Sequence, residues 1–163
     1  IFLDKPFQVG DIITLGSTTG LVEKVGFRST RLRTFDKSIV TVPNKNLVNA
    51  ELDNLGLRPV RRVKTNIGLI YSTPIEQIKN IVNDIQELID DHKQTTQDGK
   101  VRFLNFGDSS LDVMVLYFVN SPDWNILVDT QQEINFKIIE IVKKHQSDFA
   151  YPTTSVFLEN QKS

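Results

Sequence analysis

Residues 34–49 read TFDKSIVTVPNKNLVN and contain a strand, an abrupt stop and the start of a helix. The β-branched residues at 38–42 predict the strand. Pro43 has no N–H to donate to a sheet, and Asn44 favours turns and helix caps, so the strand must end at this pair. Residues 45–49 then predict one short helical turn. Such a fixed corner either only redirects the chain or also holds something in place.

Short β-rich segments precede this corner at regular spacing. Strands that recur about every ten residues, with turn residues between them, are typical of a small sandwich or barrel. We therefore predict a compact all-β domain over residues 1–56. Its predicted strands are residues 11–15, 20–27, 28–35 and 38–42, and Gly10, Gly16 and the pair Asp36-Lys37 supply the turns.

A different pattern follows the corner. Residues 60–71 alternate apolar and polar side chains, which predicts a half-buried strand. Pro74 after Ser72 and Thr73 predicts the start of a helix that runs to His92. The order β-α-β-β-α-β is completed by a hairpin over residues 101–107 and 111–120, a helix over 124–145 and a short strand at 155–158.

This order predicts a ferredoxin-like α/β domain over residues 57–163, in which two helices cover one face of a four-stranded antiparallel sheet. The whole chain is therefore expected to be mixed β and α+β. Apolar residues three or four positions apart form a stripe on each helix. The predicted stripes are Ile75, Ile78, Val82, Ile85 and Ile89 on the first helix, and Leu127, Ile134, Ile138, Ile141 and Val142 on the second.

The predicted strand at 111–120 is apolar on both of its faces. One face carries the odd-numbered residues from Leu111 to Val119, and the other carries Met114, Leu116 and Phe118. Because the two helices can cover only one face of the sheet, the other face needs a partner from a neighbouring domain or another subunit. We therefore predict Met114, Leu116 and Phe118 as an oligomer contact.

The composition argues against several kinds of active site. The chain has no Cys, which excludes disulfides and thiolate metal sites, and His92 and His145 lack partners at metal-ligand spacing, so no metal or cofactor is expected. The string GDSSL at 107–111 resembles a serine-hydrolase motif. A nucleophile at Ser109 or Ser110 would need a base, and no histidine lies in a partner motif, so a polar β-turn is favoured. The chain is predicted not to be an enzyme.

Positive charge is concentrated in the first part of the chain. Residues 1–73 carry an excess of five positive charges, and residues 74–163 an excess of six negative charges. Clustered Arg and Lys contact phosphates, so an alternative function is an Sm-like RNA-binding module fused to a ferredoxin-like domain. Aromatic stacking residues are not interleaved with these basic residues, so no nucleic acid is expected. A solvated face is favoured, or a basic surface near anionic lipid or along an ion path. The basic set is Arg28, Arg31, Arg33, Arg58, Arg61, Arg62 and Lys64.

The sequence also indicates whether this chain contains a membrane-spanning helix. Its longest purely apolar run, residues 113–119, is far shorter than the roughly 20 residues that a membrane-spanning helix needs. The chain is therefore expected to be soluble. It opens on Ile1-Phe2-Leu3, with no Met and no signal-peptide pattern, so we expect a longer protein in which another segment precedes it.

Four stretches together resemble one known family. They are KPFQVGDII at 5–13, GLVE at 20–23, RSTRLRTFDKSIVTVPNKNL at 28–47 and RPVRR at 58–62. In this order and spacing they resemble the cytoplasmic portion of the small-conductance mechanosensitive channel family. The similarity extends less specifically through residue 158. It implies an Sm-like β-barrel followed by the α/β domain, and transmembrane helices that are absent from this chain.

The resemblance also implies a function, an assembly and a location. In this family the cytoplasmic parts form a homoheptameric cage with side portals beneath a membrane pore, at the cytoplasmic face of the inner membrane. The channel releases ions and small solutes on hypo-osmotic shock. By resemblance, this chain would serve as the vestibule, supplying subunit assembly, solute filtering and coupling to the pore helix. Its partners would be copies of itself, ions, solutes and, through the missing helices, the membrane.

Individual residues match the family pattern. Pro43 and Asn44 match its corner, which resembles a contact between the β domain and the pore helix. Pro59, Arg61 and Arg62 match the junction between the domains, near which the portals open. There, Arg61 and Arg62 would bias the local potential toward anions.

Overall fold

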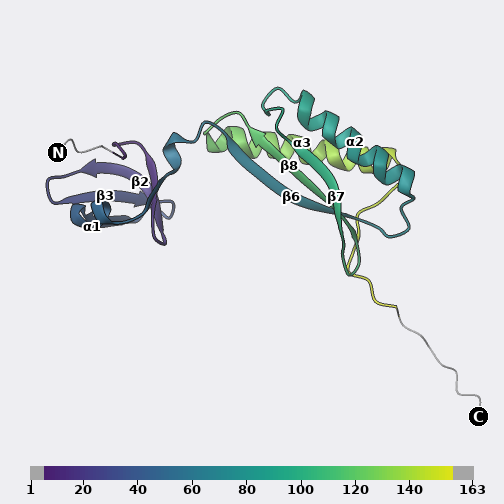
Figure 1. The fold of residues 1–163 in the computed structure, drawn as a ribbon, viewed down its shortest axis with the longest axis horizontal. Coiled ribbons are helices and arrows are strands. Elements are labelled where there is room, and N and C mark those ends of the chain that lie inside the picture. The colour runs from purple at the N-terminus through teal and green to yellow at the C-terminus, as the bar shows by residue number, and fades with distance from the viewer. Residues whose placement is uncertain (1–5, 156–163) are drawn as a thin grey trace, which may run out of the picture. The chain divides into compact units, whose positions relative to one another are not determined.

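The computed structural model describes residues 6–155 of the 163-residue chain. The chain forms two compact units, which divide between Pro59 and Val60 (Figure 1). The boundary predicted from the sequence, between residues 56 and 57, is three residues earlier. The architecture is a small β unit followed by an α+β unit, which confirms the predicted fold class.

The first unit is a five-stranded antiparallel sheet with the strand order β4-β3-β2-β1-β5. Four of its strands were predicted within two residues of their observed ends. The fifth, β5, was missed because it has only three residues, too few to show alternation. The elements are β1 (Ile12–Leu15), β2 (Thr18–Val25), β3 (Ser29–Thr34), β4 (Ile39–Pro43), the short helix α1 (Asn44–Asn49), β5 (Leu52–Asn54) and the 3₁₀ turn η1 (Leu55–Leu57).

The core of this unit is small. Each of β1 to β4 contributes one buried aliphatic side chain, and α1 adds one more from the same side of the sheet. The alternation of buried and exposed residues along β2 and β3 leaves the opposite side chains in solvent. The buried cluster is Ile13, Val22, Leu32, Val42 and Leu47.

The second unit is a three-stranded antiparallel sheet with two helices on one face (Figure 1). β8 (Leu111–Val119) lies between β6 (Arg61–Leu69) and β7 (Lys100–Phe106), and α2 (Ile75–Asp91) and α3 (Trp124–Lys144) cover it. The described part of the predicted β-α-β-β-α-β order is thereby confirmed.

The predicted last strand, residues 155–158, is not observed as predicted. Ser155 is not in a strand, and residues 156–158 lie outside the described residues. The chain runs beside β6 earlier than expected, after α3. There, Phe149 forms a bridge with Leu69, and the Ala150 N–H donates to the Gly68 carbonyl at 2.9 Å.

The helix stripes pack on the buried face of β8. The α3 prediction is confirmed in four positions, and the fifth, Ile141, is half-buried. The α2 prediction was wrong at its start, because Ile75 is the first helical residue, is 67% exposed and lines an apolar groove with Phe103 and Phe106. Ile81 is fully buried in its place, because the stripe that faces the sheet begins one turn later.

Candidate functional site

The corner at Pro43 and Asn44 holds a neighbouring segment in place. Pro43 ends β4 and stays exposed, and Asn44 begins α1 with its side chain half-buried. Asn44 Nδ2 donates to the carbonyl oxygens of Gly26 at 2.9 Å and Phe27 at 3.2 Å. Its Oδ1 accepts a hydrogen bond from Thr30 Oγ1 at 2.9 Å, and Thr30 is fully buried. Both the donor and the acceptor of the Asn44 amide therefore have hydrogen-bond partners inside the unit.

The segment that Asn44 holds is the turn between β2 and β3. The Asn44 backbone N–H donates to the Arg28 carbonyl at 3.0 Å, and the Gly26 N–H donates to the Ser29 carbonyl at 2.9 Å. A Cβ at Gly26 would lie only 2.8 Å from the Ser29 oxygen, so the turn requires glycine. Phe27 at the apex is fully exposed. The clamp thus presents an aromatic ring to solvent from a fixed backbone.

The turn and the corner lie at one end of the sheet. β2 ends and β3 begins there, and the register pairs Ser29 with Pro43, so β4 ends there as well. The residues that enter β1 run beside β2 at the same end, where the Gly10 N–H donates to the Val22 carbonyl and the Val22 N–H donates to the Asp11 carbonyl. Phe27 is therefore presented at the end where the chain enters the unit.

Two arginines of the first unit are engaged by partners within that unit. Arg33 makes two hydrogen bonds to Glu23, at 2.7 and 3.1 Å, and this pairing lowers the pKa of the Glu23 carboxyl. Arg58 donates to the Leu55 carbonyl at 3.1 Å. With two of the basic side chains engaged in this way, the RNA-binding alternative gains no support.

The two arginines at the start of β6 point to opposite faces, as neighbours on a strand must. Arg61 donates to the Pro122 carbonyl at 3.2 Å, and its guanidinium carbon lies 5.7 Å from the centre of the Trp124 ring. Arg62 is exposed and stands opposite Phe118 in the register. Arg61 therefore anchors the start of α3, whereas Arg62 faces the side of the sheet without helices.

The predicted oligomer contact lies on that uncovered face. Met114, Leu116 and Phe118 are half-buried and alternate with fully or largely buried neighbours along β8. The register places Lys64 and Lys100 on either side of Leu116, in β6 and β7 respectively. An apolar row thus runs down the middle of the face with basic side chains beside it.

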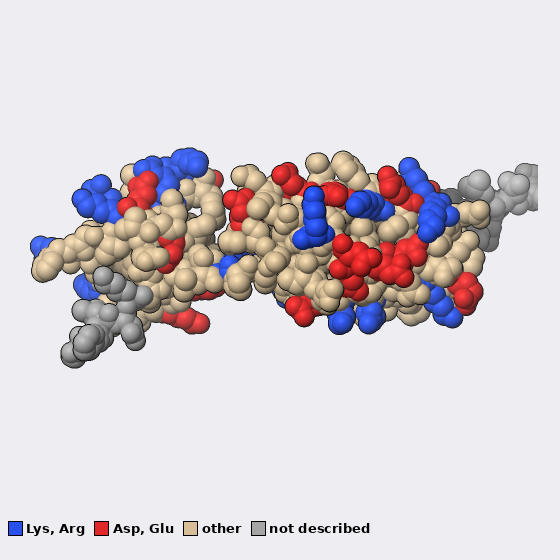
Figure 2. Space-filling view, turned by 90° about the horizontal axis from the view of Figure 1, so that it is seen from above, with Lys and Arg blue, Asp and Glu red and all other residues tan. Residues whose placement is uncertain are grey.

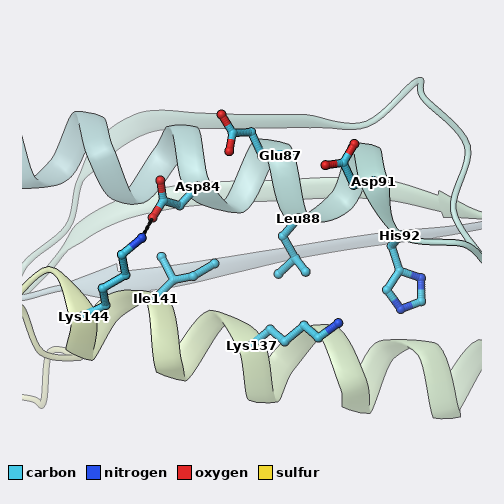
Figure 3. A pocket seen from close by; sticks show the side chains of 8 residues that line it. All are labelled: Asp84, Glu87, Leu88, Asp91, His92, Lys137, Ile141 and Lys144. Carbon is cyan, nitrogen blue, oxygen red and sulfur yellow. Dashed lines mark hydrogen bonds and ion pairs between the residues drawn. The ribbon is translucent and has the colours of Figure 1, made fainter.

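A groove with a volume of about 330 Å³ lies between α2 and α3 on the opposite face of the unit (Figure 3). Asp84 accepts from Lys144 Nζ at 2.9 Å and lies 2.8 Å from His145 Nε2, and these two contacts, that from Lys144 first, lower the pKa of its carboxyl. At the other end, Glu133 contacts Lys137 and His92, each at 3.3 Å, with a lowered pKa for the same reason.

The α2 side of this groove carries acidic side chains, the α3 side carries Lys137 and Lys144, and the floor is apolar. Leu88 and Ile141 are half-buried between the helices, while Glu87 and Asp91 are exposed along α2. Figure 2, which looks onto the molecule from above the helices, shows Asp and Glu side chains gathered over this unit. Among the residues that the structure describes, no group of three His, Asp or Glu side chains is arranged to hold a metal ion.

The GDSSL string is a turn, as predicted. The Gly107 N–H donates to the Ser110 carbonyl at 2.7 Å, and Ser110 Oγ donates to Asp112 Oδ1 at 2.6 Å. The Tyr71 hydroxyl donates to the Gly107 carbonyl. The imidazoles of both histidines contact carboxylates across the α2–α3 interface, so neither serves Ser109 or Ser110 as a base.

Sequence reasoning missed several residues of these sites. Gly26 and Phe27 could have been suspected, because a glycine between two strands is typical of a tight turn, whereas no sequence signal marks Thr30. Glu87 and Asp91 give no signal of a site in the sequence, because carboxylates on a helix usually lie on a solvated face. No helix in the described range 6–155 combines the length and the hydrophobicity that crossing a bilayer requires.

Comparisons with known proteins agree with this architecture. Residues 1–57 match the family model for the mechanosensitive ion channel β-domain, and residues 63–149 match that for the MscS C-terminal domain. An MscS family protein of Aquifex aeolicus is 45% identical over 98% of this chain and 44% of its own length. The small-conductance mechanosensitive channel MscMJ of Methanocaldococcus jannaschii is 40% identical over 98% of this chain and 45% of its own length.

Solved structures give the same result for the fold. Arabidopsis thaliana MSL1 superposes with a TM-score of 0.82 at 25% identity, covering 92% of this chain and 54% of that one. Helicobacter pylori MscS in a closed state gives 0.78 at 23% identity, covering 96% and 61%. This chain spans about half the length of the curated relatives it matches. With the β-domain and the C-terminal domain in sequence, the chain belongs to the MscS family of mechanosensitive ion channels.

Proposed function

We propose that this chain is the cytoplasmic vestibule of a channel that opens under membrane tension and releases ions and small solutes on hypo-osmotic shock. In the full-length protein it works as a homo-oligomer, a heptamer by resemblance to the family, at the cytoplasmic face of the inner membrane. The name of MscMJ, 40% identical over nearly the whole of this chain, supports a channel rather than an enzyme. The role of the chain is assembly, filtering of solutes and coupling to the pore helix.

The observation that carries the coupling role is the clamp between Asn44 and the turn at Phe27. The Asn44 amide bonds Gly26, Phe27 and Thr30, so Asn44 contributes to the coupling by fixing this turn. Contact with the membrane part passes through the exposed Phe27 ring, at the end of the sheet where the chain enters. Because the turn at Phe27 is rigid, a movement of the segment that precedes the β unit would move the sheet with it.

The filtering role involves the junction at Pro59, Arg61 and Arg62. Pro59 and Arg62 are exposed, and Arg61 is bound to the start of α3. An exposed guanidinium beside an opening concentrates anions and repels cations. Arg62 therefore supplies a positive charge near the portal, and Arg61 is held at the start of α3.

The test is made with the full-length protein in bacterial cells that lack their own mechanosensitive channels. The expected results are survival of osmotic downshock and, in excised patches, a current that opens with suction. A protein that is present in the membrane but passes no tension-dependent current overturns the proposal.

A further inference from the structure

We propose that the uncovered sheet face of the second unit docks in the α2–α3 groove of the next copy of the chain. The proposal rests on the homo-oligomer of the proposed function and names the two surfaces that meet. The sheet face is defined by Arg62, Lys64, Lys100, Met114, Leu116 and Phe118, and the groove by Glu87, Leu88, Asp91 and Ile141.

The sheet face combines apolar area with free positive charge. Leu116 and Phe118 are half-buried although no helix covers them, which leaves apolar surface in solvent. Arg62, Lys64 and Lys100 are exposed, and within residues 6–155 the structure gives none of them a hydrogen bond or an ion pair. The face therefore presents an apolar row beside unpaired cations.

The groove presents the opposite pattern. Asp84 in the groove pairs with Lys144, and Lys137 pairs with Glu133 of its own helix. Glu87 and Asp91 are exposed and have no partner among the described residues. Figure 3 shows Leu88 pointing from α2 toward α3, below these two carboxylates.

The spacings of the two surfaces also agree. Arg62 and Lys64 are two residues apart on a strand, which separates them by about 6.7 Å. Glu87 and Asp91 are four residues apart on a helix, which separates them by about 6 Å. Two parallel ion pairs therefore form in one register, with Leu116 and Phe118 against Leu88 and Ile141.

The sheet face and the groove of one copy cannot contact each other, because the helices lie on one face of the sheet and the basic row lies on the other. The contact joins two different patches, so it repeats head to tail and closes into a ring or continues as a filament. A ring is the form that fits around a pore.

Disulfide cross-linking of the full-length protein in membranes tests this contact. The present chain contains no Cys, so an introduced pair adds the only thiols in this part. Lys64→Cys combined with Glu87→Cys is expected to give a ladder of cross-linked oligomers under mild oxidation. Each single variant is expected to remain uncross-linked. The matched control replaces Glu87→Cys with Glu76→Cys, an exposed carboxylate on the same helix about 16 Å away.

A charge exchange gives a second readout. Glu87→Lys with Asp91→Lys is expected to lower the yield of ladder from a Leu116→Cys and Leu88→Cys pair about tenfold, and adding Arg62→Glu with Lys64→Glu is expected to restore it. Equal cross-linking in test and control pairs, or no ladder from a protein of oligomeric mass, overturns this interface while leaving the proposed function intact. A protein of monomeric mass overturns the proposed assembly as well.

Discussion

Asn44 bonds the carbonyl of Phe27 at 3.2 Å, yet the Phe27 ring lies wholly in solvent. The backbone of the turn is fixed while its side chain has no partner within the described unit. An apolar ring held in this way is suited to contact another part of the protein.

Asn44→Ala removes three side-chain hydrogen bonds of the clamp and leaves the Thr30 hydroxyl buried without its acceptor. We expect the free energy of unfolding of the chain to fall by about 1–3 kcal/mol. In the full-length protein we also expect altered gating or inactivation. Denaturant titration and patch recording measure the two effects. Asn46→Ala, at an exposed position in the same helix, is the control, and equal effects of both variants would contradict the clamp.

Phe27→Ser is expected to separate coupling from folding. Because the ring is fully exposed, its loss should change the free energy of unfolding by no more than about 0.5 kcal/mol. The tension needed to open the full-length channel should nevertheless change, because the proposed contact is lost. Phe35→Ser, at another exposed aromatic of the same unit, is the control. An unchanged opening tension in Phe27→Ser would remove the ring from the coupling.

Arg62→Glu and Arg61→Glu are expected to differ, although the residues are neighbours. Arg62→Glu should shift the ion preference of the full-length channel toward cations, because a positive charge near the proposed portal becomes negative. Arg61→Glu should mainly lower the stability of the second unit, because it removes the contacts of Arg61 to Pro122 and Trp124. Reversal potentials under a salt gradient and melting temperatures test both variants. An unchanged reversal potential in Arg62→Glu would refute the charge role.

The Asp84 pair makes the second unit sensitive to acid. Lys144 and His145 hold the pKa of the Asp84 carboxyl below its usual value, so the folded state favours the ionised form. The resulting stabilisation is present above the ordinary carboxyl pKa of about 3.9 and is lost as pH falls through the lowered folded value. We expect Asp84→Asn to lower the melting temperature at pH 6, with the difference from wild type shrinking below about pH 4.

Asp98→Asn is the control for this pH series, because Asp98 is exposed and its carboxylate has no partner in the described range. Its melting curve should follow that of the wild type at each pH. A gap between Asp84→Asn and wild type that stays constant down to pH 2 would show that the ion pair is not the source of the stability.

Elements with strong periodicity could be predicted from the sequence. The alternation along β8 identified both its buried residues and the uncovered Met114, Leu116 and Phe118, because a strand has a fixed period of two. The stripe of α3 was equally clear. At Ile75 the prediction failed, because periodicity identifies a helix face but not the turn at which the sheet begins beneath it.

The sites depend on contacts that no local pattern contains. Asn44 and Gly26 are 18 residues apart, and turn propensities cannot tell which carbonyl an amide will bond. The same limit applies to Glu87 and Asp91. In the sequence they are acidic residues near the end of a helix, and only the packing of α3 beside α2 makes them the rim of a groove.

Arg61 and Arg62 point to opposite faces of the sheet, so the pairing register of β6 against β8 decides which face each guanidinium occupies. Residues inserted before Arg61 lengthen the tether between the two units and leave each guanidinium on its own face of the sheet. A slip of β6 against β8 by one position instead exchanges the faces of every side chain in the strand. Arg61 would then leave Trp124, and Val63 would leave the core. The tether between the units can therefore change in length, but β6 cannot shift against β8 by an odd number of residues without exchanging the faces of its side chains.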